Sequence, residues 1–263
     1  VDGMDMFELE KASWLDVQVA AKVGENFGSI VGPDFKRNDA GQVLIDPSTG
    51  LPEYDKSNHV LGNASWDWTG GVTTTLSYKN LSLNAIFDVK VGADLYSMSE
   101  RAAYESGKAK ATLQGRDEWY RSEEQREAAG VAKGMSNWTP TGGFVAPGVI
   151  DNGDGTYRPN DIKINPEDYW MSVCRNAPSM FIYDNSYIKC RELTLTYQVP
   201  TAWLHNWVKA LSVSFVARNP FIVWKNIPDI DPDSNYNNTT GMGLEYGSLP
   251  SRKSYGFNVN IKF

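Results

Sequence analysis

Hydrophobic and polar residues alternate along several segments of this chain, most regularly in the last one. In residues 254–263 the odd positions are Tyr255, Phe257, Val259, Ile261 and Phe263, whereas the even positions are Ser, Gly, Asn, Asn and Lys. Because successive side chains of a strand point to opposite faces, this pattern predicts a strand with one apolar and one polar face. The segment is long enough to cross a bilayer as a tilted strand, which needs about 9–11 residues. A half-buried strand of a soluble protein shows the same alternation, so this segment alone leaves both alternatives open.

Five further segments alternate in the same way: residues 13–23, 68–78, 81–91, 183–198 and 210–224. Lys79-Asn80 joins the second and third of the six strands as a tight hairpin turn. Along the chain, long connections alternate strictly with short ones, as they do in outer-membrane barrels with long extracellular loops and short periplasmic turns. The sequence therefore predicts an all-β fold, an antiparallel transmembrane β-barrel to which this chain contributes six C-terminal strands.

The longest connection, residues 93–180, is predicted to be a partly helical extracellular insertion. Residues 97–110 and 117–129 have helical patterns, with Ser97 or Ser99 and Asp117 as candidate N-caps. Loops of this length usually carry function. Six strands are too few to close a barrel, and an open sheet edge in lipid leaves backbone groups without partners. The chain also begins at Val1 without a signal peptide, so we expect it to be one part of a longer protein, residues 1–263 forming the C-terminal portion of the barrel.

Composition narrows the classes of partner. The net charge is −7, which argues against a nucleic-acid surface. No apolar run approaches the length of a membrane helix, and the mean hydropathy is −0.42. Alternating barrel strands give such low averages, so these values do not argue against a membrane protein. Cys174 and Cys190 are compatible with a disulfide or with two free thiols.

Several segments resemble the motifs of one family in order and spacing. They are GENFGSI at 24–30, LGN at 61–63 with the segment from Trp66 to Tyr78, GADLYS at 92–97, SYIKCRELTLTYQVP at 186–200, ARNPF at 217–221 and DIDPD at 229–233. The corresponding family patterns are G-x-x-[YF]-G, lGn with a following aromatic strand, GgDiys, SfiRLreltLgYtlP, gqNlf and the DPE loop. Together they resemble the C-terminal part of SusC/RagA-type TonB-linked (TonB-dependent) outer-membrane transporters of Bacteroidetes.

The resemblance implies a 22-stranded barrel in the cell outer membrane, with an N-terminal plug domain and a TonB box that this chain does not contain. It implies active import of oligosaccharides or peptides, powered through TonB, with a SusD-like surface lipoprotein as a lid. We expect no cofactor, apart from the calcium ion that one loop could bind. The alternatives from other classes are an outer-membrane adhesin or structural barrel without transport, and a soluble β-sandwich that binds carbohydrate.

Individual residues give candidate sites. Asp88, Lys90, Glu192 and Arg218 lie at polar positions of the predicted strands, where they either contact plug and substrate or form a solvated inner wall. Aromatic residues of the predicted external loops are candidates for ligand or lid contact, although packing within the loops explains them as well. These aromatics are Trp66, Trp119, Tyr120, Trp138 and Trp170.

Three further points complete the prediction. The apolar face of the last strand, ending at Phe263, is a candidate signal for the machinery that assembles barrels. Residues 151–156 resemble a calcium loop but lack its full spacing and its distal Glu, so a polar turn is the alternative. The two histidines, His59 and His205, lie in unrelated loops, and the sequence contains neither H-E-x-x-H nor G-x-S-x-G. We therefore expect no enzymatic activity.

Overall fold

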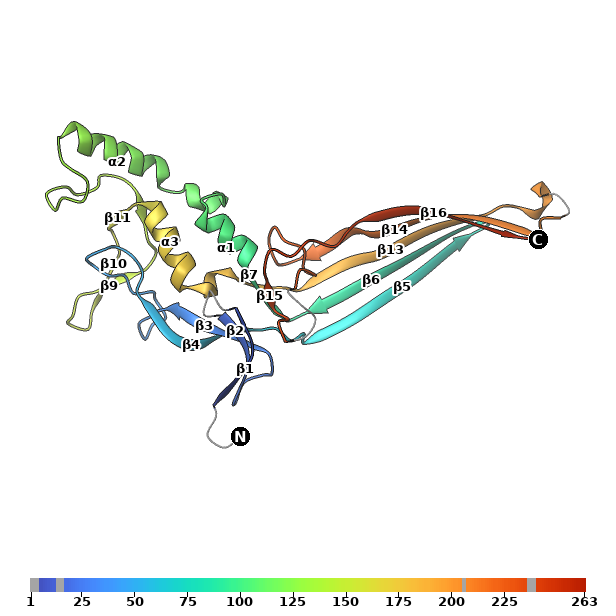
Figure 1. The fold of residues 1–263 in the computed structure, drawn as a ribbon, viewed down its shortest axis with the longest axis horizontal. Coiled ribbons are helices and arrows are strands. Elements are labelled where there is room, and N and C mark those ends of the chain that lie inside the picture. Colours follow the sequence, from blue (N-terminus) through green and yellow to red (C-terminus); the bar gives the residue numbers. More distant parts are fainter. Residues whose placement is uncertain (1–4, 13–16, 205–206, 236–239) are drawn as a thin grey trace.

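Long strands form an extended sheet at one end of the molecule, and helices with shorter strands form a compact body at the other (Figure 1). The structure is a computed structural model that describes residues 5–12, 17–204, 207–235 and 240–263. The C-terminus lies at the far end of the long sheet, whereas the first described strand belongs to the compact body. Within the described residues, no helix is both long and apolar enough to span a membrane.

The long sheet contains five antiparallel strands in the order β16-β14-β13-β6-β5. Their bounds are β5 (Trp68–Tyr78), β6 (Leu81–Val91), β13 (Tyr187–Gln198), β14 (Ala210–Lys225) and β16 (Ser254–Lys262). Five of the six segments predicted from alternation are therefore strands of one sheet. The predicted antiparallel all-β fold is confirmed.

The connections between these strands separate by length at the two ends of the sheet. The turn at Lys79 and Asn80 and the connection through η3 (Thr201–Trp203) lie at the end that carries the C-terminus. Lys79 takes a φ of 53°, which lets two residues close the β5–β6 hairpin. The connections spanning residues 92–186 and 226–253 both emerge at the opposite end, within the compact body (Figure 1). The short connections thus lie at one end of the long sheet and the long connections lie at the other, as the predicted alternation requires.

The two faces of the long sheet differ in character. One continuous apolar row crosses all five strands through Leu76, Leu83, Leu195, Phe215 and Phe257. Leu76 is 63% exposed and Phe257 is 79% exposed. On the other face, polar side chains bond across strands, as between the hydroxyl groups of Ser77 and Ser82 at 2.9 Å and of Thr196 and Ser214 at 2.8 Å. A broad apolar face that no described residue covers is a surface for another apolar phase or partner.

The first predicted strand needs a correction. Residues 17–22 form β2 of a separate four-stranded sheet in the compact body, and residues 13–16 lie outside the described part of the chain. The order of this sheet is β1-β2-β3-β4, and its strands are β1 (Met6–Ala12), β2 (Val17–Lys22), β3 (Ser29–Phe35) and β4 (Tyr54–Asn63). Val17, Gln18, Val19 and Ala20 are all buried, so both faces of β2 are covered, unlike those of the long sheet. A period of two identifies a strand but not the sheet that it joins, and for this reason the prediction failed here.

The insertion between β6 and β13 is more structured than the sequence predicted. It contains β7 (Asp94–Ser97), α1 (Met98–Glu105), η1 (Lys110–Leu113), α2 (Arg116–Ala128), β8 (Phe144–Val145), β9 (Val149–Asp151), β10 (Tyr157–Pro159), β11 (Lys163–Ile164), α3 (Pro166–Asn176), η2 (Pro178–Phe181) and β12 (Ile182–Asp184). Strand β7 also pairs with β15 (Leu244–Glu245) from the last long connection. This pairing ties the two long connections together.

Local signals explain the helices of the insertion. Ser97 caps α1, since its hydroxyl accepts a hydrogen bond from the Glu100 amide at 3.1 Å, as predicted. Helix α2 starts after Gly115, and Asp117 lies in its first turn instead of at the cap. The sequence analysis missed α3, although its Asn165 cap followed by Pro166 is a recognisable helix start.

The main hydrophobic core lies in the compact body. Helix α3 supplies Tyr169, Trp170, Val173 and Cys174 to it, and strands β2 and β3 supply Val19 and Ile30 among others. The two cysteines are buried free thiols, which settles the question that the sequence left open. The long sheet, in contrast, has an apolar face that no layer of the described residues covers.

Candidate functional site

A β-bulge in β13 concentrates charged side chains at one end of the long sheet. The pairing register of β13 shifts between Cys190 and Glu192. Against β6 these two residues face the adjacent Phe87 and Ile86, which leaves Arg191 as an extra residue of β13. The register against β14 shifts at the same place, but there the extra residue lies on β14. A bulge of this kind redirects side chains. As a result, Lys189, Arg191 and Glu192 all contact residues of the polar face, although strict alternation would place Arg191 and Glu192 on opposite faces.

Lys189 is the most buried charge of this region, with a side chain only 2% exposed. Its ammonium group donates to Asp231 Oδ1 at 2.9 Å, Asp231 Oδ2 at 3.0 Å and Asp233 Oδ2 at 2.7 Å. It also donates to the hydroxyl of Ser251 at 2.6 Å. All three partners belong to the connection between β14 and β16. One lysine of the long sheet therefore bonds to residues near both ends of that connection.

Arg191 extends the same network. Its guanidinium donates to Asp233 through Nη1 and to Asp88 of β6 through Nη2, and its Nη2 lies 3.0 Å from the Tyr187 hydroxyl. The Tyr187 hydroxyl in turn donates to Asp233 Oδ1 at 2.8 Å. We call Asp88, Lys189, Arg191, Asp231 and Asp233 the charge latch, since together they join two strands of the wall to the last long connection.

The electrostatics of the latch favour ionised carboxylates. Burial alone would raise the pKa of Asp233, but hydrogen bonds from Arg191, Lys189 and Tyr187 outweigh it and hold that pKa well below its usual value. Asp231 shows the same balance: burial raises its pKa, whereas the hydrogen bond from Lys189 and two further donors lower it. The carboxylates of Asp231 and Asp233 therefore stay charged at neutral pH, where they face the cations of Lys189 and Arg191.

The four predicted wall residues lie on this same polar face but do not form one site. Asp88 belongs to the charge latch. Lys90 Nζ lies 5.4 Å from the centre of the Trp66 ring, a cation–π contact. Glu192 and Arg218 pair with each other across β13 and β14 at 3.3 Å, and the Arg218 side chain is 67% exposed.

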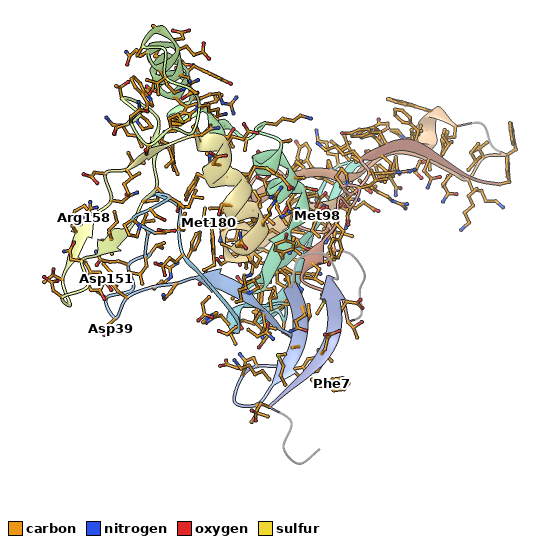
Figure 2. The ribbon with its side chains drawn as sticks, turned by 60° about the vertical axis from the view of Figure 1, so that its left-hand side comes forward. Phe7, Asp39, Met98, Asp151, Arg158 and Met180 are labelled. Carbon is orange, nitrogen blue, oxygen red and sulfur yellow. The ribbon has the colours of Figure 1, made fainter. Side chains whose placement is uncertain are left out.

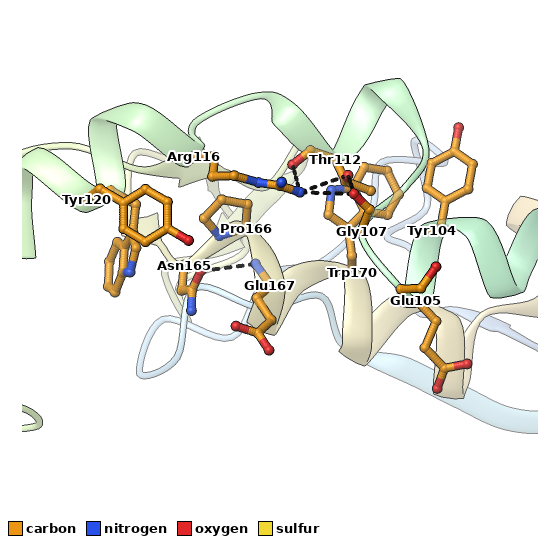
Figure 3. Close-up of a pocket in the computed structure, with 12 residues that line it drawn as sticks. Tyr104, Glu105, Gly107, Thr112, Arg116, Tyr120, Asn165, Pro166, Glu167 and Trp170 are labelled. Atoms are coloured by element: carbon orange, nitrogen blue, oxygen red, sulfur yellow. Dashed lines mark hydrogen bonds between the residues drawn. The ribbon is translucent and has the colours of Figure 1, made fainter.

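The five predicted loop aromatics separate into three groups. Trp66 packs edge-on against Tyr187 at the mouth of the sheet, with ring centres 5.8 Å apart. Trp119, Tyr120 and Trp170 line a single cavity of the insertion (Figure 3). Trp138 lies outside that lining, and its buried indole Nε1 has no hydrogen-bond partner among the described residues.

The candidate calcium loop is a pair of polar turns. Asp151 Oδ1 accepts from the Gly153 amide at 2.7 Å, and Asp154 Oδ1 accepts from the Thr156 amide at 2.9 Å. Figure 2 shows Asp151 and Arg158 on the β9–β10 hairpin at the margin of the compact body, away from the long sheet. Within the described ranges, no group of three or more His, Cys, Asp or Glu residues is placed to hold a metal ion.

The terminal strand places all its candidate assembly residues on the apolar face. Tyr255, Phe257, Val259, Ile261 and Phe263 are between 47% and 79% exposed. The Phe263 ring stacks on Trp207 at 5.5 Å with an interplanar angle of 7°. The last residue is therefore positioned by an aromatic contact that the sequence analysis did not anticipate.

Sequence reasoning missed Lys189 and Arg191 as functional residues. The signal was present, because two cations on one strand and three Asp residues in one short loop are complementary in charge. No spacing rule connects positions that lie about forty residues apart, so only the fold shows that they meet.

Comparison with known proteins confirms the resemblance found in the sequence. No family model matches the chain. It is 23% identical to the TonB-dependent receptor P3 of Formosa agariphila in an alignment of 294 positions that covers all of this chain and 25% of the relative. Structures of the RagAB peptide importer superpose with TM-scores of 0.55 in the closed-closed state and 0.57 in the open-open state, at 16% and 18% identity, and a further RagAB peptide transporter structure gives 0.57 at 17%. The chain spans about a quarter of the length of each of these proteins.

Proposed function

We propose that this chain is the C-terminal portion of the barrel of a TonB-dependent transporter in the outer membrane. The single observation that carries the proposal is the long sheet with opposite faces. Its apolar face is exposed across all five strands, as a lipid-facing wall requires, and its polar face carries hydroxyl, amide and charged groups, as a water-filled lumen requires.

The edges of the long sheet support a partial barrel. Strands β5 and β16 are the outermost strands, and each has one edge that no described strand pairs. In lipid such an edge would cost several kcal/mol for each unpaired backbone group. We therefore infer that a longer protein supplies further strands to both edges. The plug domain and TonB box that transport requires are proposed on the family resemblance alone.

The proposed activity is active import of oligosaccharides or peptides, with a SusD-like lipoprotein as the lid. The named relatives, a TonB-dependent receptor and a peptide importer, support the class of activity. This chain contributes structure to the mechanism. The long sheet forms part of the pore wall, and the long connections form part of its extracellular opening. None of these roles requires a bond to be made or broken by the chain.

Uptake by cells tests the proposal. A strain that lacks the full-length protein should fail to take up fluorescently labelled oligosaccharides or peptides, and a gene encoding the intact protein should restore uptake. A gene without the TonB box should restore surface expression but not uptake. Uptake that survives removal of the TonB box, or a barrel that never supports uptake of either class, would favour the adhesin or structural alternative.

The insertion is our candidate for lid docking. Helix α2 protrudes from the compact body (Figure 1), so residues 110–141 can be replaced by a Gly-Ser linker without removing a strand of the long sheet. We expect this variant to reach the membrane but to lose co-purification with the lipoprotein. If the lipoprotein still co-purifies at the wild-type ratio, docking lies elsewhere.

A further inference from the structure

The two ends of the long sheet differ in charge. No Asp or Glu occurs in residues 68–87, 193–228 or 246–263, and these ranges contain the parts of the five strands that lie next to the short connections. The charged side chains nearest to that end are those of Lys79, Lys209 and Lys262, and all three are exposed. At the opposite end, the charge latch combines cations with carboxylates. The short-connection end (Figure 1) therefore carries lysines and no carboxylate side chain from these ranges.

The pairing register places Lys209 beside the apolar face and Lys262 on the polar face. Lys209 immediately precedes β14, whose Ala210 pairs with Lys262, so Lys209 falls in the row of Phe263. The Nζ of Lys209 donates to the backbone oxygen of Phe263 at 3.1 Å. Lys262 lies two residues after Asn260, and it therefore shares the polar face with that residue.

The β5–β6 turn holds Lys79 at the same end of the sheet. The Lys79 Nζ lies 5.3 Å from the centre of the Tyr78 ring, an exposed side chain of the apolar face. Asn80 Nδ2 donates to Gln198 O at 2.8 Å, and the Gln198 amide donates to Asn80 O at 2.8 Å, so the turn is bonded to β13. Two strand spacings separate β6 from β14, which puts Lys79 and Lys209 roughly 10 Å or more apart. The two lysines can therefore contact separate groups of a partner.

Large exposed aromatic rings accompany these two lysines. Trp203 is 71% exposed and Trp207 is 64% exposed, and the Trp207 ring stacks on Phe263. Trp and Tyr concentrate where the apolar interior of a membrane meets the headgroups. The inference rests on the proposed function, in which the apolar face of the long sheet contacts lipid. The aromatic rings then place Lys79 and Lys209 at the depth of the headgroups.

We propose that the short-connection end binds the phosphate groups of anionic phospholipids through Lys79 and Lys209. Lys209 donates one hydrogen bond to Phe263 and has two further donors for phosphate oxygens. An anionic membrane surface attracts each lysine that lies near it. A phospholipid matches both parts of this surface, because its acyl chains cover the apolar face and its headgroup meets the lysines. A protein partner would need an acidic surface and an apolar surface at the same depths.

Native mass spectrometry of the full-length protein in a neutral detergent tests the proposal, with an equimolar mixture of phosphatidylglycerol and phosphatidylcholine as the probe. The wild type should retain phosphatidylglycerol in preference to phosphatidylcholine, and the preference should weaken as the salt concentration rises. Lys79→Gln and Lys209→Gln should each weaken phosphatidylglycerol binding about fivefold. The variant with both substitutions should show no preference between the two lipids.

Lys262→Gln is the matched control, because it removes an exposed lysine at the same end of the sheet but on the polar face. Its lipid preference should equal that of the wild type. The variant that combines Lys79→Arg with Lys209→Arg keeps both charges and should keep the preference. All these variants should unfold at the temperature of the wild type in detergent, since the three side chains are exposed.

Three results overturn the proposal. The first is equal retention of the two lipids by the wild type. The second is a loss of phosphatidylglycerol binding in Lys262→Gln as large as that in Lys209→Gln. The third is lysine-dependent binding of an acidic peptide without any lipid preference, which would indicate a protein partner. A full-length protein that stays in solution without detergent and retains neither lipid would overturn the proposed function as well, so the two failures are distinguishable.

Discussion

Replacement of Lys189 by Met should release the last long connection from the sheet wall. Lys189 makes four hydrogen bonds of 2.6–3.0 Å to Asp231, Asp233 and Ser251, and its side chain is 2% exposed. Removal of one partner from a buried ion pair costs about 3–5 kcal/mol, because the remaining charge stays buried without compensation. Met fills the volume of the lysine stem but carries no charge, so it isolates the electrostatic part of the loss.

The structure places this cost at the lower end of that range. Asp233 still pairs with Arg191, and Asp231 still accepts hydrogen bonds from the amides of Asp233 and Ser251. A loss of about 3 kcal/mol makes the open form of the connection roughly a hundredfold more populated. Hydrogen exchange of residues 229–235, measured by mass spectrometry on the full-length protein in detergent, should accelerate by about that factor.

Two further variants distinguish the loss of the charge latch from a general destabilisation of the protein. Arg218→Ala removes an ion pair whose cation is 67% exposed, which is worth at most about 1 kcal/mol, and exchange in residues 229–235 should not change. Lys189→Met combined with Asp231→Asn removes charge from both sides and should exchange more slowly than Lys189→Met alone. The reasoning is refuted if Lys189→Met exchanges like the wild type, or if the double variant is the fastest of the set.

Three other perturbations give independent checks. The pKa values of Asp231 and Asp233 are lower in the folded state than in the unfolded state. The stability that the charge latch adds is therefore complete above about pH 4 and is lost as the pH falls further. Hydrogen exchange in residues 229–235, corrected for intrinsic rates, should be constant from about pH 5 to pH 8 and should accelerate only in stronger acid. Gly243→Ala should destabilise the compact body by about 1–3 kcal/mol more than Gly153→Ala in thermal melts. Both glycines have a positive φ, but a Cβ at Gly243 would lie 2.4 Å from Ala64 Cβ, whereas nothing lies within 4 Å at Gly153. Phe263→Ser should lower the amount of protein at the cell surface far more than it lowers uptake per assembled molecule, and equal surface levels on immunoblots would remove its assembly role.

The sequence predicted the long sheet well because its physical cause is local. Each strand of the long sheet has one face of apolar side chains and one face of polar side chains, so hydrophobic and polar residues alternate along β5, β6, β13, β14 and β16. The same rule failed for residues 17–22, since β2 is buried on both faces and its alternation reflects no such boundary. Helix α1 was predicted because Ser97 is a recognisable N-cap. Helix α3 was not predicted, because the segment before it is rich in Gly and Pro and was interpreted as a loop.

The charge latch shows why the candidate site was harder to predict than the fold. Alternation along β13 correctly grouped Glu192 with Thr194 and Thr196, but the bulge at Arg191 breaks that parity. Above the bulge, Lys189 and Arg191 face the same side as Asp88 only because one extra residue has been inserted. A one-residue change of register leaves no mark in composition or hydropathy. Its consequence is electrostatic: two cations gather at the end of the wall where the long connections emerge, and the acidic 229–233 segment folds back onto them. The bulge therefore links the long sheet, which the sequence predicts, to the position of the connection between β14 and β16, which the sequence does not predict.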